Sequence, residues 1–293
     1  MKGGEKIMKK LITRVLFVSL MTPFCLTGAM AAEEGEHAGG TPHYPLKHPH
    51  NMEWSFSGPV GTYDRAQLQR GLKVYKEVCS ACHSMDLVPF RTLTDLGYSE
   101  EQVKTFAADY EIEAGPDNDG NMYMRPGIPS DYFPAPFANA EQAAASNNGA
   151  APPDLSLMAK ARGITRGFPT FVFDIFTQYQ EGGPDYIYSL LTGYEQAPEG
   201  VEVPAGGHYN PYFANAAALA MAPPLSDGIV SYEDGSPETV DQYAKDISAF
   251  LMWTAEPKLE ARKQTGLVVM VFLVILTVLV YLTKKSIYAR KPH

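Results

Sequence analysis

Cys79-Ser80-Ala81-Cys82-His83 is the stretch of sequence that decides the fold of this chain. It has the form C-x-x-C-H, which is the attachment signature of a c-type haem. In this chemistry two thiols add across the two vinyl groups of one porphyrin, and the adjacent imidazole is then positioned under the iron. The motif therefore predicts one haem c, attached covalently through Cys79 and Cys82, with His83 as an iron ligand.

The number of cysteines favours this interpretation over two others. The chain has three cysteines, and one of them, Cys25, falls in a leader segment described below. A thioredoxin-type redox pair would follow a strand in a βαβ pattern, and no such pattern precedes Cys79. A structural zinc site would need about four ligands, and there is no second pair of cysteines.

Helical patterns lie on both sides of this motif. Asp64 is a candidate N-cap, and the residues that follow at one-face helical spacing are Leu68, Leu72, Tyr75 and Cys79. A later helix is expected to begin at Ser236-Pro237, with proline at its first position, and to end at Pro257. We therefore predict a mainly α fold, a cytochrome c-type haem domain with long loops.

Two apolar segments lie outside this domain. Residues 1–31 combine a basic start, a short apolar run and the small-residue site Ala29-Met30-Ala31, as a secretory signal does. Gly266–Thr283 is 18 residues long and uncharged, and at about 1.5 Å per residue it spans roughly 27 Å of a hydrocarbon core of about 30 Å. Four basic residues follow it, which predicts a cytoplasmic C-terminus.

The expected organisation has four parts. They are a cleaved signal peptide over residues 1–31, a periplasmic cytochrome c domain over 32–262, a transmembrane anchor over 263–283 and a cytoplasmic tail over 284–293. The formal charge of −9 on 293 residues divides unevenly among them. Without the leader and the tail, 15 basic and 32 acidic residues remain, a charge near −17. Such a field repels nucleic acid and attracts a basic protein.

The acidic residues are densest between positions 100 and 120. Seven acids stand there against one base, Lys104; they are Glu100, Glu101, Asp109, Glu111, Glu113, Asp117 and Asp119. We expect this region to help steer a basic electron acceptor, although a solvated face is the plainer interpretation of any single acid.

Methionine or histidine is expected as the second axial ligand of the iron. Met221 is favoured by its position, because it precedes Pro223-Pro224 and lies shortly before the last helix of the domain. A proline-rigidified loop can hold a thioether at a fixed distance. The alternatives that remain open are Met122, Met124, Met158 and His208.

Several motifs together resemble the cytochrome c1 family, of the alphaproteobacterial type. They are Trp54–Pro59 (WSFSGP), Cys79–Met85 (CSACHSM), Asn147–Ser156 (NNGAAPPDLS), Tyr186–Tyr194 (YIYSLLTGY) and Met221–Leu225 (MAPPL). The resemblance covers nearly all of the chain after the leader, and the motifs are specific as a set. It implies that Met221 is the axial methionine.

The resemblance implies further contacts with the haem. Arg162 falls where the family has an arginine against a haem propionate, a carboxylate that a guanidinium suits. Asn147, Pro153, Tyr186 and Phe213 match other residues of the haem pocket. One departure is an aromatic-rich insert at about residues 163–185, which mitochondrial members largely lack and whose aromatic side chains we expect to form a small hydrophobic unit.

The resemblance also implies an activity and its partners. The haem of this family takes one electron from a Rieske iron–sulfur protein and passes it to a cytochrome c. It does so within quinol–cytochrome c oxidoreductase, a proton-translocating and dimeric complex with cytochrome b in the bacterial inner membrane. The chain is then an electron-transfer subunit with no catalytic residues of its own.

Two other functions share some of these features. A membrane-anchored mono-haem cytochrome c that feeds a terminal oxidase would have the same leader, haem motif and anchor, and differs by lacking the motifs after residue 120. A catalytic haem enzyme such as a peroxidase would need an open sixth position on the iron, which a proline-flanked Met221 disfavours.

Overall fold

The computed structural model describes residues 46–163 and 182–289. Most of the ordered structure is helical, and it ends in one long apolar helix, as predicted. The signal peptide over 1–31 lies outside the described residues, as do the aromatic residues expected in the insert (Phe168, Phe171, Phe173, Phe176 and Tyr179).

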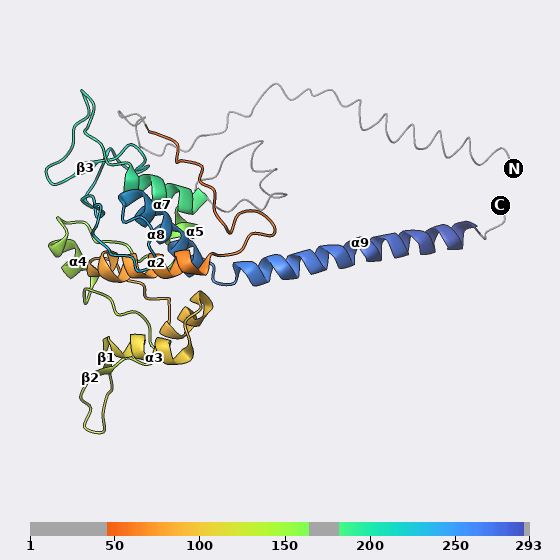
Figure 1. Ribbon diagram of the computed structural model, residues 1–293, viewed down its shortest axis with the longest axis horizontal. Helices are drawn as coiled ribbons and strands as arrows, with labels where there is room; N and C mark the ends of the chain where they lie inside the picture. The colour runs from red at the N-terminus through yellow and green to blue at the C-terminus, as the bar shows by residue number, and fades with distance from the viewer. Residues whose placement is uncertain (1–45, 164–181, 290–293) are drawn as a thin grey trace, which may run out of the picture. The chain divides into compact units, whose positions relative to one another are not determined.

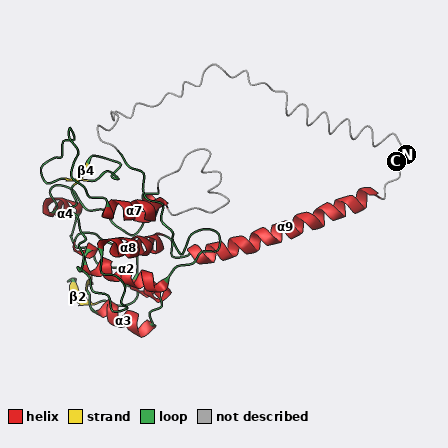
Figure 2. Cartoon of the chain, turned by 45° about the horizontal axis from the view of Figure 1, so that its top comes forward, coloured by secondary structure: helices red, strands yellow, loops and turns green. Residues whose placement is uncertain are grey.

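Three helices, α2 (Arg65–Glu77), α8 (Val240–Ala255) and α7 (Gly182–Thr192), form the centre of the domain that carries the C-x-x-C-H motif. They lie side by side, with α8 between the other two (Figures 1 and 2). The short helix α5 (Met158–Ala161) packs against both α7 and α8. A continuous cluster of buried apolar side chains from these helices forms the core.

Gly71 allows α2 and α8 to approach closely. A Cβ atom at this position would lie 2.3 Å from the backbone oxygen of Asp246 and 2.5 Å from the Cβ of Phe250. Beside this crossing, the fully buried carboxylate of Asp246 accepts hydrogen bonds from Arg70 Nε at 2.9 Å and from the Tyr232 hydroxyl at 2.9 Å. The pairing with Arg70 compensates the negative charge of Asp246, which would otherwise be costly to bury.

The start of α2 agrees with its prediction, because the Asp64 side chain accepts hydrogen bonds from Ala66 N and Gln67 N. The predicted start of α8 is wrong. Ser236 lies in a turn, where its amide donates to Asp234 Oδ1 at 3.0 Å, and the helix begins at Val240 with Thr239 as its N-cap.

A smaller region follows the haem motif in the sequence. It contains η2 (Phe90–Leu96), α3 (Glu100–Ala108) and a hairpin of β1 (Glu111–Ala114) and β2 (Tyr123–Pro126), with Glu111 opposite Pro126. In both views α3 and the hairpin lie on the side of α2 that is remote from α7 (Figures 1 and 2). The acidic residues between 100 and 120 therefore lie on α3, on β1 and in the segments that directly follow each of them.

The end of the expected insert belongs to the core. Gly182–Asp185 form the first turn of α7, where Asp185 is buried and its Oδ1 accepts a hydrogen bond from Trp54 Nε1 at 2.8 Å. Gly183 allows the first turn of α7 to lie directly against α5, since a Cβ at this position would lie 1.6 Å from the backbone oxygen of Ala159. The last residues of the expected insert therefore pack as part of α7.

The apolar segment predicted as a membrane anchor is part of α9 (Leu259–Ala289). This helix begins seven residues before the apolar run, directly after α8 and the turn that follows it. Lys263, near its start, is buried, and its Nζ donates a hydrogen bond to the backbone oxygen of Phe56 at 2.6 Å. By length and composition α9 is able to cross a membrane.

Candidate functional site

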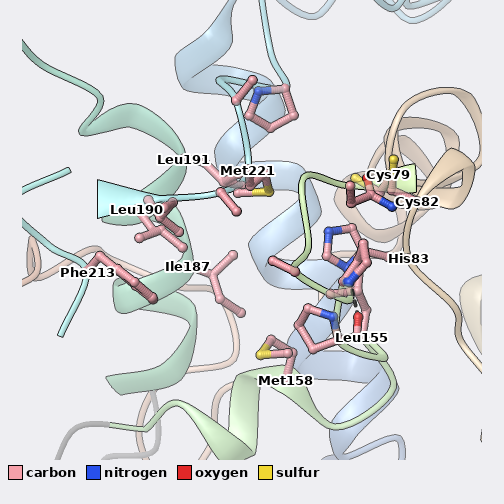
Figure 3. A pocket seen from close by; sticks show the side chains of 18 of the residues that line it. Cys79, Cys82, His83, Leu155, Met158, Ile187, Leu190, Leu191, Phe213 and Met221 are labelled. Atoms are coloured by element: carbon pink, nitrogen blue, oxygen red, sulfur yellow. Dashed lines mark hydrogen bonds between the residues drawn. The ribbon is translucent and has the colours of Figure 1, made fainter. Parts of the chain in front are cut away.

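A largely apolar cavity of about 570 Å³ lies where α2 ends, beside α7 and α8. Its walls come from segments far apart in the sequence, and Figure 3 shows their side chains pointing into a common space. The predicted ligands Cys79, Cys82, His83 and Met221 all line it. The volume is typical of a cofactor pocket.

The two thiols follow directly on α2. Cys79 begins the short 3₁₀ turn η1 (Cys79–Ala81), and Cys82 follows this turn as its C-cap. Both are free thiols. Burial, with a smaller contribution from the nearby Cys82, raises the pKa of the Cys79 thiol to about 12. A redox-active dithiol needs the opposite shift, so this environment disfavours the thioredoxin-type alternative.

His83 is held by a backbone carbonyl. Its Nδ1 lies 2.7 Å from the backbone oxygen of Pro153, a distance at which Nδ1–H donates and Nε2 keeps its lone pair. Burial lowers the pKa of the imidazole, while the bond to Pro153 acts in the opposite direction. A neutral imidazole whose second nitrogen is bonded in this way is the usual form of a metal-ligating histidine.

Met221 reaches the cavity from a separate loop. Two residues before it, Leu219 pairs with His208 in a small sheet of β3 (His208–Tyr209) and β4 (Ala218–Leu219). The Tyr194 hydroxyl donates a hydrogen bond to the Met221 backbone oxygen at 3.1 Å. A β-ladder and a half-buried tyrosine therefore fix the segment in which Met221 lies.

The other candidates for the second axial ligand differ in position. His208 is paired in β3 and is not among the residues that line the cavity. Met122 and Met124 lie at the exposed hairpin, with 54% and 56% of their surface accessible. Met158 does line the cavity, but it comes from the segment that holds His83 through Pro153. This geometry favours Met221, which enters from a different segment.

Comparison with known proteins identifies the family of this chain. The model of the cytochrome c1 family matches residues 54–291. The chain belongs to the cytochrome c1 family. Its relatives include a cytochrome c1 of Rhodospirillum rubrum, 45% identical over 83% of this chain and 89% of the relative. A mitochondrial "Cytochrome c1, heme protein" of Schizosaccharomyces pombe is 46% identical over 83% of this chain and 73% of the relative.

A third relative is longer than this chain. The "Cytochrome b/c1" of Bradyrhizobium diazoefficiens is 57% identical over 82% of this chain, and the chain spans 36% of its length. Membership of the cytochrome c1 family implies a haem cofactor and a role in electron transport.

The other haem-pocket residues expected from the family also meet at this cavity. Asn147, Pro153, Arg162, Tyr186 and Phe213 all line it. Tyr186 is buried on α7, Asn147 is the C-cap of α4 (Ala140–Ser146), and Arg162 is the exposed C-cap of α5.

Some residues of the site were not found by sequence reasoning. The Asp154 carboxylate accepts hydrogen bonds from Ser84 Oγ at 2.9 Å, Asp86 N at 2.8 Å and Ser156 N at 2.9 Å. It thereby joins the residues after His83 to the segment that carries Pro153. Its only signal in the sequence was its place in the motif that ends in Asp154-Leu155-Ser156.

A second group that sequence reasoning missed is apolar. The side chains that form much of the wall are Ile187, Leu190 and Leu191 on α7 and Ile247 and Leu251 on α8. On α7 the spacing of four between Ile187 and Leu191, which is typical of one helical face, was the available signal.

The residues of the cavity fit a haem. Two thiols suit the two vinyl groups, an imidazole and a thioether suit the two axial positions of iron, and apolar walls suit the porphyrin ring. In the part of the chain that the structure describes, no cluster of three or more His, Cys, Asp or Glu side chains offers a zinc-type site. When bound, a haem supplies reversible one-electron chemistry at its iron.

Proposed function

We propose that this chain binds one haem c through Cys79 and Cys82, with His83 and Met221 as axial ligands. In this role it is the electron-transfer subunit of a quinol–cytochrome c reductase. It accepts single electrons from a Rieske iron–sulfur protein and delivers them to a basic cytochrome c. The observation that carries the proposal is the convergence of two free thiols, a carbonyl-bonded histidine and Met221 on one apolar cavity.

The residues of the chain have distinct tasks in this function. Pro153 and Asp154 fix the orientation of His83, and the Tyr194 hydroxyl fixes the loop of Met221. The apolar side chains of α7 and α8 exclude water and so lower the local dielectric constant. The reorganisation energy of electron transfer is therefore kept small. Arg162 lies at the edge of the cavity, where its guanidinium is available to a propionate.

A proposal about the axial ligand can be tested with two matched variants. We expect Met221→Leu in the full-length haem protein to lower the midpoint potential and to let the reduced protein bind carbon monoxide. Met158→Leu, which changes another methionine of the same cavity, should leave both properties unchanged. An unchanged potential and ligand-field spectrum in Met221→Leu would mean that the assignment is wrong.

Recognition of the electron acceptor is proposed to be electrostatic. The acids of α3 and β1 are exposed, and none of the residues 100–120 lines the cavity. They would therefore act by long-range steering rather than at the edge of the cavity, where the exposed residues include Ala151, Ala220 and Ala222 and no acid. We expect electron transfer to cytochrome c to slow steeply as salt rises, and a rate that is flat up to physiological ionic strength would contradict this.

The assembly and the topology are also proposals. The relative named cytochrome b/c1 supports cytochrome b as a partner, and the complex is proposed to be dimeric. The haem domain would be periplasmic and the tail cytoplasmic, with the four parts bounded at residues 31, 262 and 283. Purification of the tagged full-length chain in mild detergent should yield cytochrome b and a Rieske protein. A terminal oxidase in their place would favour the alternative function.

A further inference from the structure

Residues 47–54, which we call the strap, run along α7 before α2 begins. The backbone amide of Met52 donates a hydrogen bond to Asp185 Oδ1 at 3.1 Å, near the start of α7. The backbone amide of His50 donates to Ser189 Oγ at 2.7 Å, four positions further along the helix. Positions four apart share one face of a helix. The strap therefore covers one face of α7, while a different face lines the haem cavity.

The first residues of the strap also hold the loop that follows β3. The backbone amide of Lys47 donates a hydrogen bond to the backbone oxygen of Pro211 at 2.8 Å. His50 Nε2 and the Tyr212 hydroxyl lie 2.8 Å apart, within hydrogen-bond distance. The ammonium of Lys47 lies 5.9 Å from the centre of the Tyr212 ring. Three contacts therefore hold two neighbouring residues, and the next residue, Phe213, lines the haem cavity.

The ring of Tyr212 packs against the turn that ends α7. Tyr212 is buried, and a Cβ at Gly193 would lie 2.3 Å from Cδ2 of its ring. Tyr194 follows in the same turn, and its hydroxyl donates the hydrogen bond to the Met221 backbone oxygen at 3.1 Å. A continuous path of contacts therefore leads from the strap, through the Tyr212 ring, to the loop of Met221.

The loop of Met221 lies at the surface on its other side. Ala222 and Pro223 are exposed, and Met221 itself is half-buried. The ladder of β3 and β4 ends two residues before it, at Leu219. The position of the thioether therefore depends on the contacts that reach its loop from α7, and the strap holds the outer end of those contacts.

We propose that the strap positions Met221 as the axial ligand of the haem iron, with Tyr212 and His50 as the positioning residues. The inference rests on the proposed ligation of the iron by Met221 and adds a requirement for a segment that does not touch the cavity. Groups that orient a metal ligand from behind commonly alter the affinity of the site when they are removed. Loss of the contact between His50 and Tyr212 lets the Tyr212 ring withdraw from Gly193, and the Tyr194 hydroxyl then holds the Met221 loop less firmly.

Competition by imidazole for the iron of the full-length ferric haem protein in detergent measures how firmly Met221 is held. We expect Tyr212→Phe, which keeps the ring and removes its hydroxyl, to raise the apparent affinity for imidazole about fivefold, the equivalent of one neutral hydrogen bond. His50→Ala should raise it by the same factor. The double variant should raise it no further, because both changes remove the same contact.

A matched tyrosine separates positioning from a general loss of stability. The Tyr63 hydroxyl donates a hydrogen bond to the backbone oxygen of Glu256 at 3.1 Å, and Tyr63 does not line the haem cavity. Tyr63→Phe should therefore lower the melting temperature without changing the affinity for imidazole. Hydrogen exchange followed by mass spectrometry gives a second measurement that does not depend on the iron. The amides of residues 209–221 should exchange faster in Tyr212→Phe and His50→Ala and at the wild-type rate in Tyr63→Phe.

Several results would overturn the role of the strap. They are an unchanged affinity for imidazole in Tyr212→Phe and His50→Ala, an equal rise in Tyr63→Phe, factors that multiply in the double variant, and unchanged exchange of residues 209–221. Met221→Leu distinguishes these results from a failure of the proposed function, because it should raise the affinity for imidazole far more than any strap variant. An unchanged affinity in Met221→Leu would refute the axial assignment itself.

Discussion

Replacement of Asp154 by alanine should separate the two segments that hold the proximal side of the haem pocket. The carboxylate accepts hydrogen bonds from Ser84 Oγ, Asp86 N and Ser156 N, all at 2.8–2.9 Å. Burial alone would raise the pKa of Asp154, but these bonds outweigh it and hold the pKa below its usual value. The carboxylate is therefore charged at neutral pH.

The expected magnitude follows from these three bonds. A buried hydrogen bond to a charged group contributes about 1.5–3 kcal/mol. Because Asp154 is only half-buried, water replaces part of each bond in the variant, and about 1 kcal/mol per bond is a fair value. We expect Asp154→Ala to lower the free energy of unfolding by about 3 kcal/mol. Asp154→Asn, which keeps one acceptor oxygen, should lose less.

Urea unfolding of the full-length haem protein in detergent, followed by far-ultraviolet circular dichroism, measures this loss. Asp119→Ala is the matched control, because Asp119 is exposed and its change should stay within about 0.5 kcal/mol. The haem absorption should respond in the same order, since Asp154 supports the segment bonded to His83. A loss for Asp154→Ala no larger than that of the control would refute the reasoning.

Three further predictions concern the crossing of α2 and α8. In the urea titration, Asp246→Ala should lower the free energy of unfolding by about 3–5 kcal/mol, because it leaves Arg70 without its buried partner. Asp234 pairs with the same arginine at a more exposed position, so Asp234→Ala should lower the free energy of unfolding much less. Hydrogen bonds from the Ser236 backbone and from Arg70 lower the pKa of Asp234 to about 2. The stabilisation of the fold by the ionised Asp234 is therefore fully present above about pH 4. It is lost as the pH falls towards 2, and the difference in urea midpoint between wild type and Asp234→Ala should shrink accordingly. Gly71→Ala should prevent stable packing of the helices, whereas Gly266→Ala, where a Cβ meets nothing within 4 Å, should leave the melting temperature unchanged.

Features of the fold that depend on neighbours in the sequence could be predicted without the structure. The cap at Asp64 and the apolar anchor each arise from a short stretch with a strong local preference. The start of α8 could not be predicted in the same way, because Asp234 engages the Ser236 amide and Asp227 accepts a hydrogen bond from Val240 N at 2.7 Å. Because of these contacts, the residues from Ser236 to Thr239 lie outside the helix, although their sequence is typical of a helix start.

The same division applies to the candidate site. The thiols and His83 are adjacent in the sequence, so one motif predicts them together. Met221 was favoured over Met158 by its position and by the family resemblance, and only the packing around Pro153 and Tyr194 gives a geometric reason. The hydrogen bonds of Asp154 join residues about 70 positions apart, and no local sequence pattern predicts such contacts.

The pairing of α2 with α8 has a consequence for the order of events during synthesis. Arg70 and Asp246, which meet at this crossing, are 176 residues apart. The chain emerges from its N-terminal side at about 5–20 residues per second, so α2 and the thiols behind it wait some ten seconds or more before α8 exists to cover them. During that interval the C-x-x-C-H motif is part of an open chain. If haem is attached to these thiols as proposed, the attachment can precede folding, and the packing of α8 against α2 would then close the pocket over the cofactor.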